Sequence, residues 1–166
     1  YYLACDWKNI LMFDGDGKYR GQIDRIGAGP GEYQQMGDFD VLGERIAVLD
    51  ADKVYFYTLE GSFLRRVDLP FLGTNLKLLP EGKMLLCTSR EDKAIAVVDS
   101  TGGEVARYLD FIEPISLRKL QAFIPYDGRL FFQNGAYTAD LWWYADGKAG
   151  TARLLDDEHG IGTRRV

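Results

Sequence analysis

Residues Arg45 to Leu69 read RIAVLD, AD, KVYFY, TLEG and SFLRRVDL in succession. Three short runs rich in β-branched and aromatic residues are thus separated by two tight polar breaks. This pattern is typical of consecutive strands joined by short turns. The stretch therefore predicts a strand-turn-strand-turn-strand unit, and the rest of the chain repeats it.

The repeat is clearest at a turn glycine that follows an apolar strand by four residues. Gly17, Gly61, Gly102 and Gly147 each stand four residues after Phe13, Tyr57, Val98 and Trp143, respectively. A second apolar run precedes each of these strands. A third run, in which apolar residues alternate with charges, follows each glycine, and a fourth leads each unit after the first. Four short strands per unit, with no helical period, match the blade of a β-propeller.

The predicted fold is therefore all-β, a β-propeller of four-stranded antiparallel blades in a single domain. About three and a half to four blades are expected, at residues 1–27, 37–70, 74–111 and 119–156, and the first lacks its first strand. Since propellers use about four to eight blades, we expect a partial propeller, whose open blade faces need missing blades or a partner chain. The alternatives are an all-β sandwich and a four-bladed ring closed by the tail at residues 158–166.

Composition restricts the classes of function. The 166 residues are 46% hydrophobic and 27% charged, which predicts a globular chain with a core, and the net charge is −5. Basic residues form no run longer than a pair, so nucleic acid is not an expected partner. No segment reaches the ~18 apolar residues of a membrane span. The chain begins at Tyr1, so we expect a mature or excised piece whose targeting signal is not visible.

The most distinctive segment is GAGPGEY, from Gly27 to Tyr33, which links the first blade to the second. It is not a dinucleotide fingerprint, because the third glycine is missing and a strand follows. With its neighbours it resembles the bacterial cell-envelope six-bladed β-propeller family, which has NHL-like repeats. The residues that carry the resemblance are Phe13, Asp14, Gly17, Lys18, Tyr19, Gly27, Gly29, Pro30, Gly31, Glu32, Tyr33, Asp38, Phe39, Val48, Leu49 and Asp50.

The resemblance is specific over residues 10–71 and generic beyond them. It implies six blades, of which about two would lie outside this chain. It also implies a periplasmic or cell-surface setting with a lipid anchor, and no established catalytic activity.

Strand alternation predicts where a ligand would bind. Loops from an outer strand to the next inner strand share one face with the turns between the second and third strands. The candidate ligand-binding residues on this face are Gly29, Pro30, Gly31, Glu32, Tyr33, Trp7, Asp50, Asp52 and Arg90. The expected partner is a protein, peptide or glycan, since ligand sites favour such concave places. The alternative is that the loop only locks adjacent blades together.

No catalytic or metal-binding residue is predicted. The sequence has one histidine, His159, and neither G-x-S-x-G nor H-E-x-x-H. Asp14 to Gly17 reads as a turn, because the further ligands of a calcium loop are absent. Cys5 and Cys87 occupy equivalent repeat positions and are expected to be buried thiols.

The expected function is therefore non-catalytic binding or scaffolding in the cell envelope, without a cofactor. One alternative is a lactonase-like or lyase enzyme at the channel mouth, which would use a divalent cation. The other is a sensor domain of a larger signalling protein.

Overall fold

The computed structural model describes residues 2–6, 8–88, 92–110, 123–132 and 140–153. Within these ranges the regular structure is β-strand, apart from one short 3-10 turn at Pro80–Gly82. Blade 1 contains β1 (Tyr2–Cys5), β2 (Ile10–Phe13) and β3 (Tyr19–Ile23). Blade 2 contains β4 (Asp38–Leu42), β5 (Arg45–Asp50), β6 (Lys53–Thr58) and β7 (Phe63–Asp68). Blade 3 contains β8 (Gly73–Leu78), β9 (Met84–Thr88), β10 (Lys93–Val98) and β11 (Glu104–Asp110). Blade 4 contains β12 (Ile124–Tyr126), β13 (Arg129–Phe132), β14 (Asp140–Ala145) and β15 (Lys148–Arg153).

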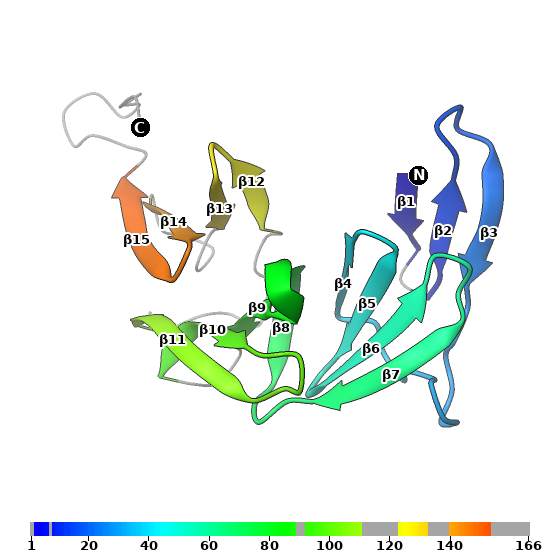
Figure 1. The fold of residues 1–166 in the computed structure, drawn as a ribbon, viewed down its shortest axis with the longest axis horizontal. Helices are drawn as coiled ribbons and strands as arrows, with labels where there is room; N and C mark the ends of the chain where they lie inside the picture. The colour runs from blue at the N-terminus through cyan, green and yellow to red at the C-terminus, as the bar shows by residue number, and fades with distance from the viewer. Residues whose placement is uncertain (1, 7, 89–91, 111–122, 133–139, 154–166) are drawn as a thin grey trace.

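These sheets form the predicted all-β propeller arrangement. In every blade each strand pairs with the next one along the chain, and all pairs are antiparallel. Figure 1 shows the blades following one another around an arc, with β4, β8 and β12 toward its centre and β3, β7, β11 and β15 on the outside. Blade 1 has three strands and the other blades have four. The predicted partial propeller with an incomplete first blade is confirmed.

The core consists of three apolar clusters, and each lies between two neighbouring blades. The strand β5 shows how one blade serves two of them. Its residues 46–49 are all fully buried; Ile46 and Val48 belong to the cluster shared with blade 1, whereas Ala47 and Leu49 belong to the cluster shared with blade 3. A strand covered on both faces is apolar at every position. This explains why the middle strands read as continuous apolar runs.

The predicted turn glycines are accompanied by a side-chain acceptor that holds the turn. The Asp14 carboxylate accepts hydrogen bonds from the backbone N–H of Asp16 and Lys18. In the same way the Thr58 hydroxyl accepts from two backbone N–H groups, and so does the Asp99 carboxylate. Such side-chain contacts to nearby backbone are typical of turns. Asp14 therefore occupies a structural position in the repeat.

One of the two cysteine predictions is wrong. Cys87 is a buried free thiol on β9, and desolvation raises its pKa. Cys5 is exposed. It lies on β1, which forms the inner edge of a three-stranded sheet, and most of this strand is exposed. The prediction for Cys5 is wrong because burial depends on the neighbouring strands, and blade 1 has no strand on the inner side of β1 among the described residues.

The inner strands of blades 2 and 3 are joined by two carboxylates. Asp38 on β4 accepts a hydrogen bond of 2.9 Å from the backbone N–H of Leu76 on β8. Asp40 accepts one of 2.7 Å from Leu78 N–H and forms an ion pair of 2.7 Å with Lys77. The edge of an inner strand presents unpaired N–H groups. Asp38 and Asp40 accept from two such N–H groups of β8, so these hydrogen bonds join β8 to β4 at a defined register.

Asp38 should make stability depend on pH. Desolvation raises the pKa of its carboxyl, although hydrogen bonds from Leu76 and Phe39 oppose the shift. Between the ordinary aspartate pKa and the raised value the folded chain binds more protons than the unfolded chain, so stability falls as pH rises through this window. Asp38→Asn keeps an acceptor oxygen and carries no proton to lose. We expect its stability relative to the parent to increase from about pH 3 to about pH 7, as urea unfolding would measure. Asp16→Asn, at an exposed turn position, is the control, and equal changes in both variants would contradict this prediction.

A candidate binding cavity at the junction of blades 1 and 2

The connection between β3 and β4 is a closed loop held by its own backbone. Gly27 N–H donates to Tyr33 O at 3.1 Å, and Tyr33 N–H donates to Arg25 O at 2.9 Å. Within the loop, Glu32 N–H donates to Gly29 O at 3.1 Å. Because its two ends are joined in this way, the loop projects as a formed unit over the junction of the blades.

The glycines of this loop make room for the side chain of Glu32. The Glu32 carboxylate turns back and accepts a hydrogen bond of 2.8 Å from Gly29 N–H. A Cβ atom at Gly27 would lie 2.0 Å from its Oε2 atom, and one at Gly29 would lie 3.0 Å from the same atom. An alanine at Gly27 would therefore displace the Glu32 carboxylate from this position, and one at Gly29 would make an unusually tight contact with it. The sequence pattern G-x-G-x-x-E thus encodes a carboxylate held inside its own loop.

Gly31 is fixed by blade 2. Its φ is +77°, and a Cβ atom there would lie 2.4 Å from Cγ of Phe63 on β7. Its carbonyl accepts a hydrogen bond of 3.0 Å from the buried Tyr57 hydroxyl, and desolvation raises the pKa of that hydroxyl. The loop is therefore pressed against the outer half of blade 2.

Tyr33 locks the blades together. Its side chain is fully buried, and its hydroxyl donates to Lys8 O in blade 1 at 2.8 Å. Its ring makes edge-to-face contacts with Tyr55 and Tyr57 in blade 2, with both centroid distances at 6.4 Å. Desolvation raises the pKa of its hydroxyl. Of the predicted ligand-binding residues, Tyr33 thus lies in the core and does not face a ligand.

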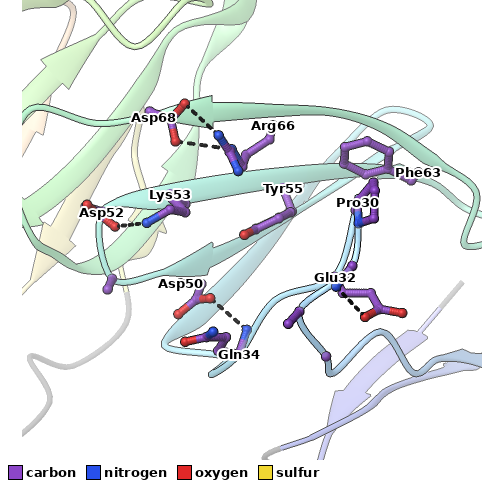
Figure 2. Close-up of a pocket in the computed structure, with 15 residues that line it drawn as sticks. Pro30, Glu32, Gln34, Asp50, Asp52, Lys53, Tyr55, Phe63, Arg66 and Asp68 are labelled. Atoms are coloured by element: carbon purple, nitrogen blue, oxygen red, sulfur yellow. Dashed lines mark hydrogen bonds and ion pairs between the residues drawn. The ribbon is translucent and has the colours of Figure 1, made fainter.

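The remaining loop residues line a cavity of about 580 Å³ (Figure 2). The structure brings Gly29, Pro30, Gly31 and Glu32 together with Asp50 and Asp52, as strand alternation predicts. The other lining residues are Gly27, Ala28, Gln34, Ala51, Lys53, Tyr55, Phe63, Arg66 and Asp68. The predicted residues Trp7 and Arg90 lie outside the described residues.

The charged groups of the cavity are each held by a neighbour. Asp50 Oδ2 accepts a hydrogen bond of 2.8 Å from Gln34 N–H, which ties the turn after β5 to the loop. Asp52 and Lys53 form an ion pair of 2.5 Å, and its hydrogen bond lowers the pKa of Asp52 and raises that of Lys53. The cavity is lined by four carboxylates, Glu32, Asp50, Asp52 and Asp68, and by two cations, Lys53 and Arg66.

The outer strand of blade 2 contributes a wall that the sequence did not identify. Arg66 pairs with Asp68 at 3.1 Å, and both side chains remain about half exposed. The Phe63 ring is 39% exposed beside them. The register places Arg66 opposite Tyr55 and Asp68 opposite Lys53, so all four side chains lie on one face of the sheet. From the sequence, the alternation of apolar and charged residues in β7 predicts only that one face of the strand is exposed to solvent.

Ala51, at the tip of the turn between β5 and β6, holds a strained backbone in this cavity. Its φ is 54°, a left-handed conformation that costs a non-glycine residue about 1–2 kcal/mol. Ala51→Gly relieves this strain but loosens the unfolded chain, so we expect a net stabilisation of about 0.5–1 kcal/mol in urea unfolding. Ala28→Gly, in the neighbouring loop at a position without positive φ, should instead destabilise. A loss of stability in Ala51→Gly would contradict the prediction.

Among the described residues, no group of three or more His, Cys, Asp or Glu side chains is placed to hold a metal ion. The described part of the chain also has no helix with the length and apolarity of a membrane span.

A family model described as "Domain of unknown function (DUF4934)" matches residues 1–149 of the chain. The chain belongs to the DUF4934 family. No curated protein matches this DUF4934 chain.

Two solved structures from Bacteroides species are similar to the DUF4934 chain. One, described as a "putative exported protein" of Bacteroides fragilis, has a TM-score of 0.69 and 24% identity, over 87% of this chain and 44% of its own length. The other, a protein of unknown function from Bacteroides caccae, has a TM-score of 0.57 and 15% identity, over 92% of this chain and 57% of its own length. At these identities the likeness establishes the fold alone. The DUF4934 chain spans about half the length of either structure.

Proposed function

We propose that this DUF4934 chain is a non-catalytic binding module of the bacterial cell envelope, and that it binds a protein, peptide or glycan in the cavity between the Gly27–Gln34 loop and blade 2. The observation that carries the proposal is the cavity itself. A preformed loop, an exposed aromatic ring and a set of polar groups converge on about 580 Å³, which is the form of a typical ligand site.

The polar groups favour binding over acid-base catalysis. A general acid or base near neutral pH needs a pKa moved toward 7, whereas the Lys53 hydrogen bond lowers the pKa of Asp52. Glu32 and Asp50 already accept backbone hydrogen bonds.

The cavity suits a ligand that has both a flat apolar face and several hydrogen-bonding groups. The exposed Phe63 ring offers a stacking surface. Arg66 and Lys53 offer donors beside it, while Asp50, Asp52 and Asp68 offer acceptors. Sugar rings and extended peptides both present this combination, and a charged metabolite without an apolar face does not.

The proposed setting is the periplasm or the cell surface, with a lipid anchor, in a six-bladed propeller with NHL-like repeats. The description of the Bacteroides fragilis neighbour as exported supports the location. The family resemblance of the GAGPGEY segment supports the blade number and the anchor. Further blades or a partner chain would cover the open faces of blades 1 and 4.

The 166-residue chain alone is expected to associate, because its two end blades expose apolar side chains. Tyr2 is 64% exposed on β1, and Ile124 and Tyr126 are 58% and 67% exposed on β12. Exposed apolar patches of this kind promote association. Sedimentation velocity over a concentration series should therefore detect species larger than a monomer. A monodisperse monomer at all concentrations would contradict the need for covering blades.

The proposed function is tested with arrays of purified bacterial-surface glycans and of synthetic peptides, followed by calorimetric titration of each ligand found. Arg66→Met should weaken binding about tenfold, since it removes a charged hydrogen bond at the wall of the cavity. Arg20→Met is the matched control, because Arg20 also forms a surface ion pair, with Asp14 at 2.8 Å, but lies away from the cavity. Equal affinities of the two variants, or no ligand on either array, would overturn the proposal.

A further inference from the structure

A second cavity lies at the other end of β5, in the groove between blades 2 and 3. Arg45 begins β5, whereas Asp50, in the cavity described above, ends it. The second cavity has a volume of about 360 Å³. Its lining residues are Leu42, Gly43, Glu44, Arg45, Phe56, Arg65, Leu78, Leu79, Glu81, Gly82 and Lys83.

The register of blade 2 explains why two arginines meet here. Ala47, Phe56 and Arg65 are directly paired across β5, β6 and β7, so their side chains share one face of the sheet. Arg45 stands two residues before Ala47 and therefore lies on the same face. This face packs against blade 3 through Ala47, Phe56 and other apolar residues. Arg45 and Arg65 therefore share this face of the sheet with the apolar cluster.

The two guanidinium groups have no carboxylate partner among the described residues. Arg65 lies over the Phe56 ring, 4.3 Å from its centroid, and donates to the carbonyl of Ser100 in blade 3. Burial and the charge of Arg45 lower its pKa. Two acidic residues line the cavity, but Glu81 pairs with Lys83 at 2.8 Å and Glu44 is an exposed turn residue. Arg45 is exposed, like Glu44, and the cavity is lined by three cations, Arg45, Arg65 and Lys83, and by two carboxylates, Glu44 and Glu81.

The floor of the cavity is apolar. Phe56 and Leu78 are 4% and 8% exposed, and both belong to the cluster between blades 2 and 3. Leu42, at the rim, is 46% exposed. An apolar floor beneath two guanidinium groups complements a ligand with an apolar body and one anionic head.

We propose that this groove binds an amphiphilic organic anion, with its carboxylate or phosphate at Arg45 and Arg65 and its apolar body on Leu42 and Leu79, which line the cavity and are more exposed than Phe56 and Leu78. Arginine is suited to this task because its planar fork binds oxyanions through paired hydrogen bonds. The site is separate from the loop cavity and does not depend on the function proposed for it.

The test uses phenyl phosphate and phenylacetate as probes, with benzyl alcohol as the uncharged counterpart, in calorimetric titrations at low salt. At least one of the two anions should bind, and benzyl alcohol should bind much more weakly. The stronger of the two anions identifies the head group. Arg45→Met should weaken binding about tenfold, whereas Arg20→Met, at a residue that lies in blade 1 and lines neither cavity, should leave it unchanged.

A second measurement separates this site from a structural role of Arg45. If Arg45 serves ligand binding and not folding, Arg45→Met should lose affinity but unfold at the same urea concentration as the parent, because Arg45 is an exposed side chain. A clear loss of stability would contradict the proposal. The proposal is overturned if neither anion binds at millimolar concentration, if benzyl alcohol binds as tightly as the anions, or if Arg45→Met and Arg20→Met bind equally.

Discussion

Replacing Tyr33 with alanine is expected to lower the free energy of unfolding by about 3–5 kcal/mol, the range for removing a large buried aromatic side chain. The ring is fully buried between blades 1 and 2, and its contacts with Tyr55 and Tyr57 would be lost. The deletion also removes the hydrogen bond to Lys8 O. Urea unfolding followed by far-ultraviolet circular dichroism measures the loss.

Two further variants separate the parts of this effect. Tyr33→Phe keeps the ring and leaves the Lys8 carbonyl without its donor, so it should cost only about 0.5–1.5 kcal/mol. Tyr2→Ala removes a ring that is 64% exposed and should stay within about 0.5 kcal/mol of the parent. If Tyr33→Ala were as mild as Tyr2→Ala, the ring would not be what joins the two blades.

Gly31→Ala is expected to cost about 2–4 kcal/mol, measured in the same way. The left-handed backbone accounts for about 1–2 kcal/mol, and overpacking against the Phe63 ring adds about 1–3 kcal/mol. The clash arises because the new Cβ would lie 2.4 Å from Phe63 Cγ. The Phe63 ring is partly exposed and can move, which favours the lower part of the range.

Gly43→Ala isolates the backbone part of that cost. Gly43 has a φ of +62°, and no atom lies within 4 Å of the Cβ position. It should therefore lose only about 1–2 kcal/mol. Equal losses in Gly31→Ala and Gly43→Ala would mean that the loop moves away from blade 2 at little cost.

The strands and the blade repeat could be predicted because each middle strand packs on both faces. In β5 this produces an unbroken apolar run from Ile46 to Leu49, which is visible without knowledge of the neighbours. The missing strand of blade 1 could also be predicted, because the first unit of the sequence has one apolar run fewer than the later units. Cys5 was mispredicted because its burial depends on strands that its own segment does not contain.

The candidate site could be predicted only in part. Strand alternation alone brings the Gly29–Glu32 segment to the Asp50 turn. The Phe63 and Arg66 wall depends on the register between β6 and β7, which a shift at Phe56 and Tyr57 alters. The burial of Tyr33 could not be foreseen either, because an aromatic residue at the end of a loop suits a ligand as well as a core.

The placement of the three apolar clusters has a wider consequence for how such a chain is assembled. Blades 2 and 3 each contact the preceding blade with one face and the following blade with the other, so the interfaces are head-to-tail. Such interfaces close only when their rotations complete a circle. Stability then resembles that of a linear array, in which each unit is stabilised mainly by its nearest neighbours. The loss of an end blade would therefore expose one apolar face of the blade next to it and leave the other junctions unchanged. The loop around Glu32 and the arginine groove each belong to one junction between blades, so each can be inherited or lost together with that junction.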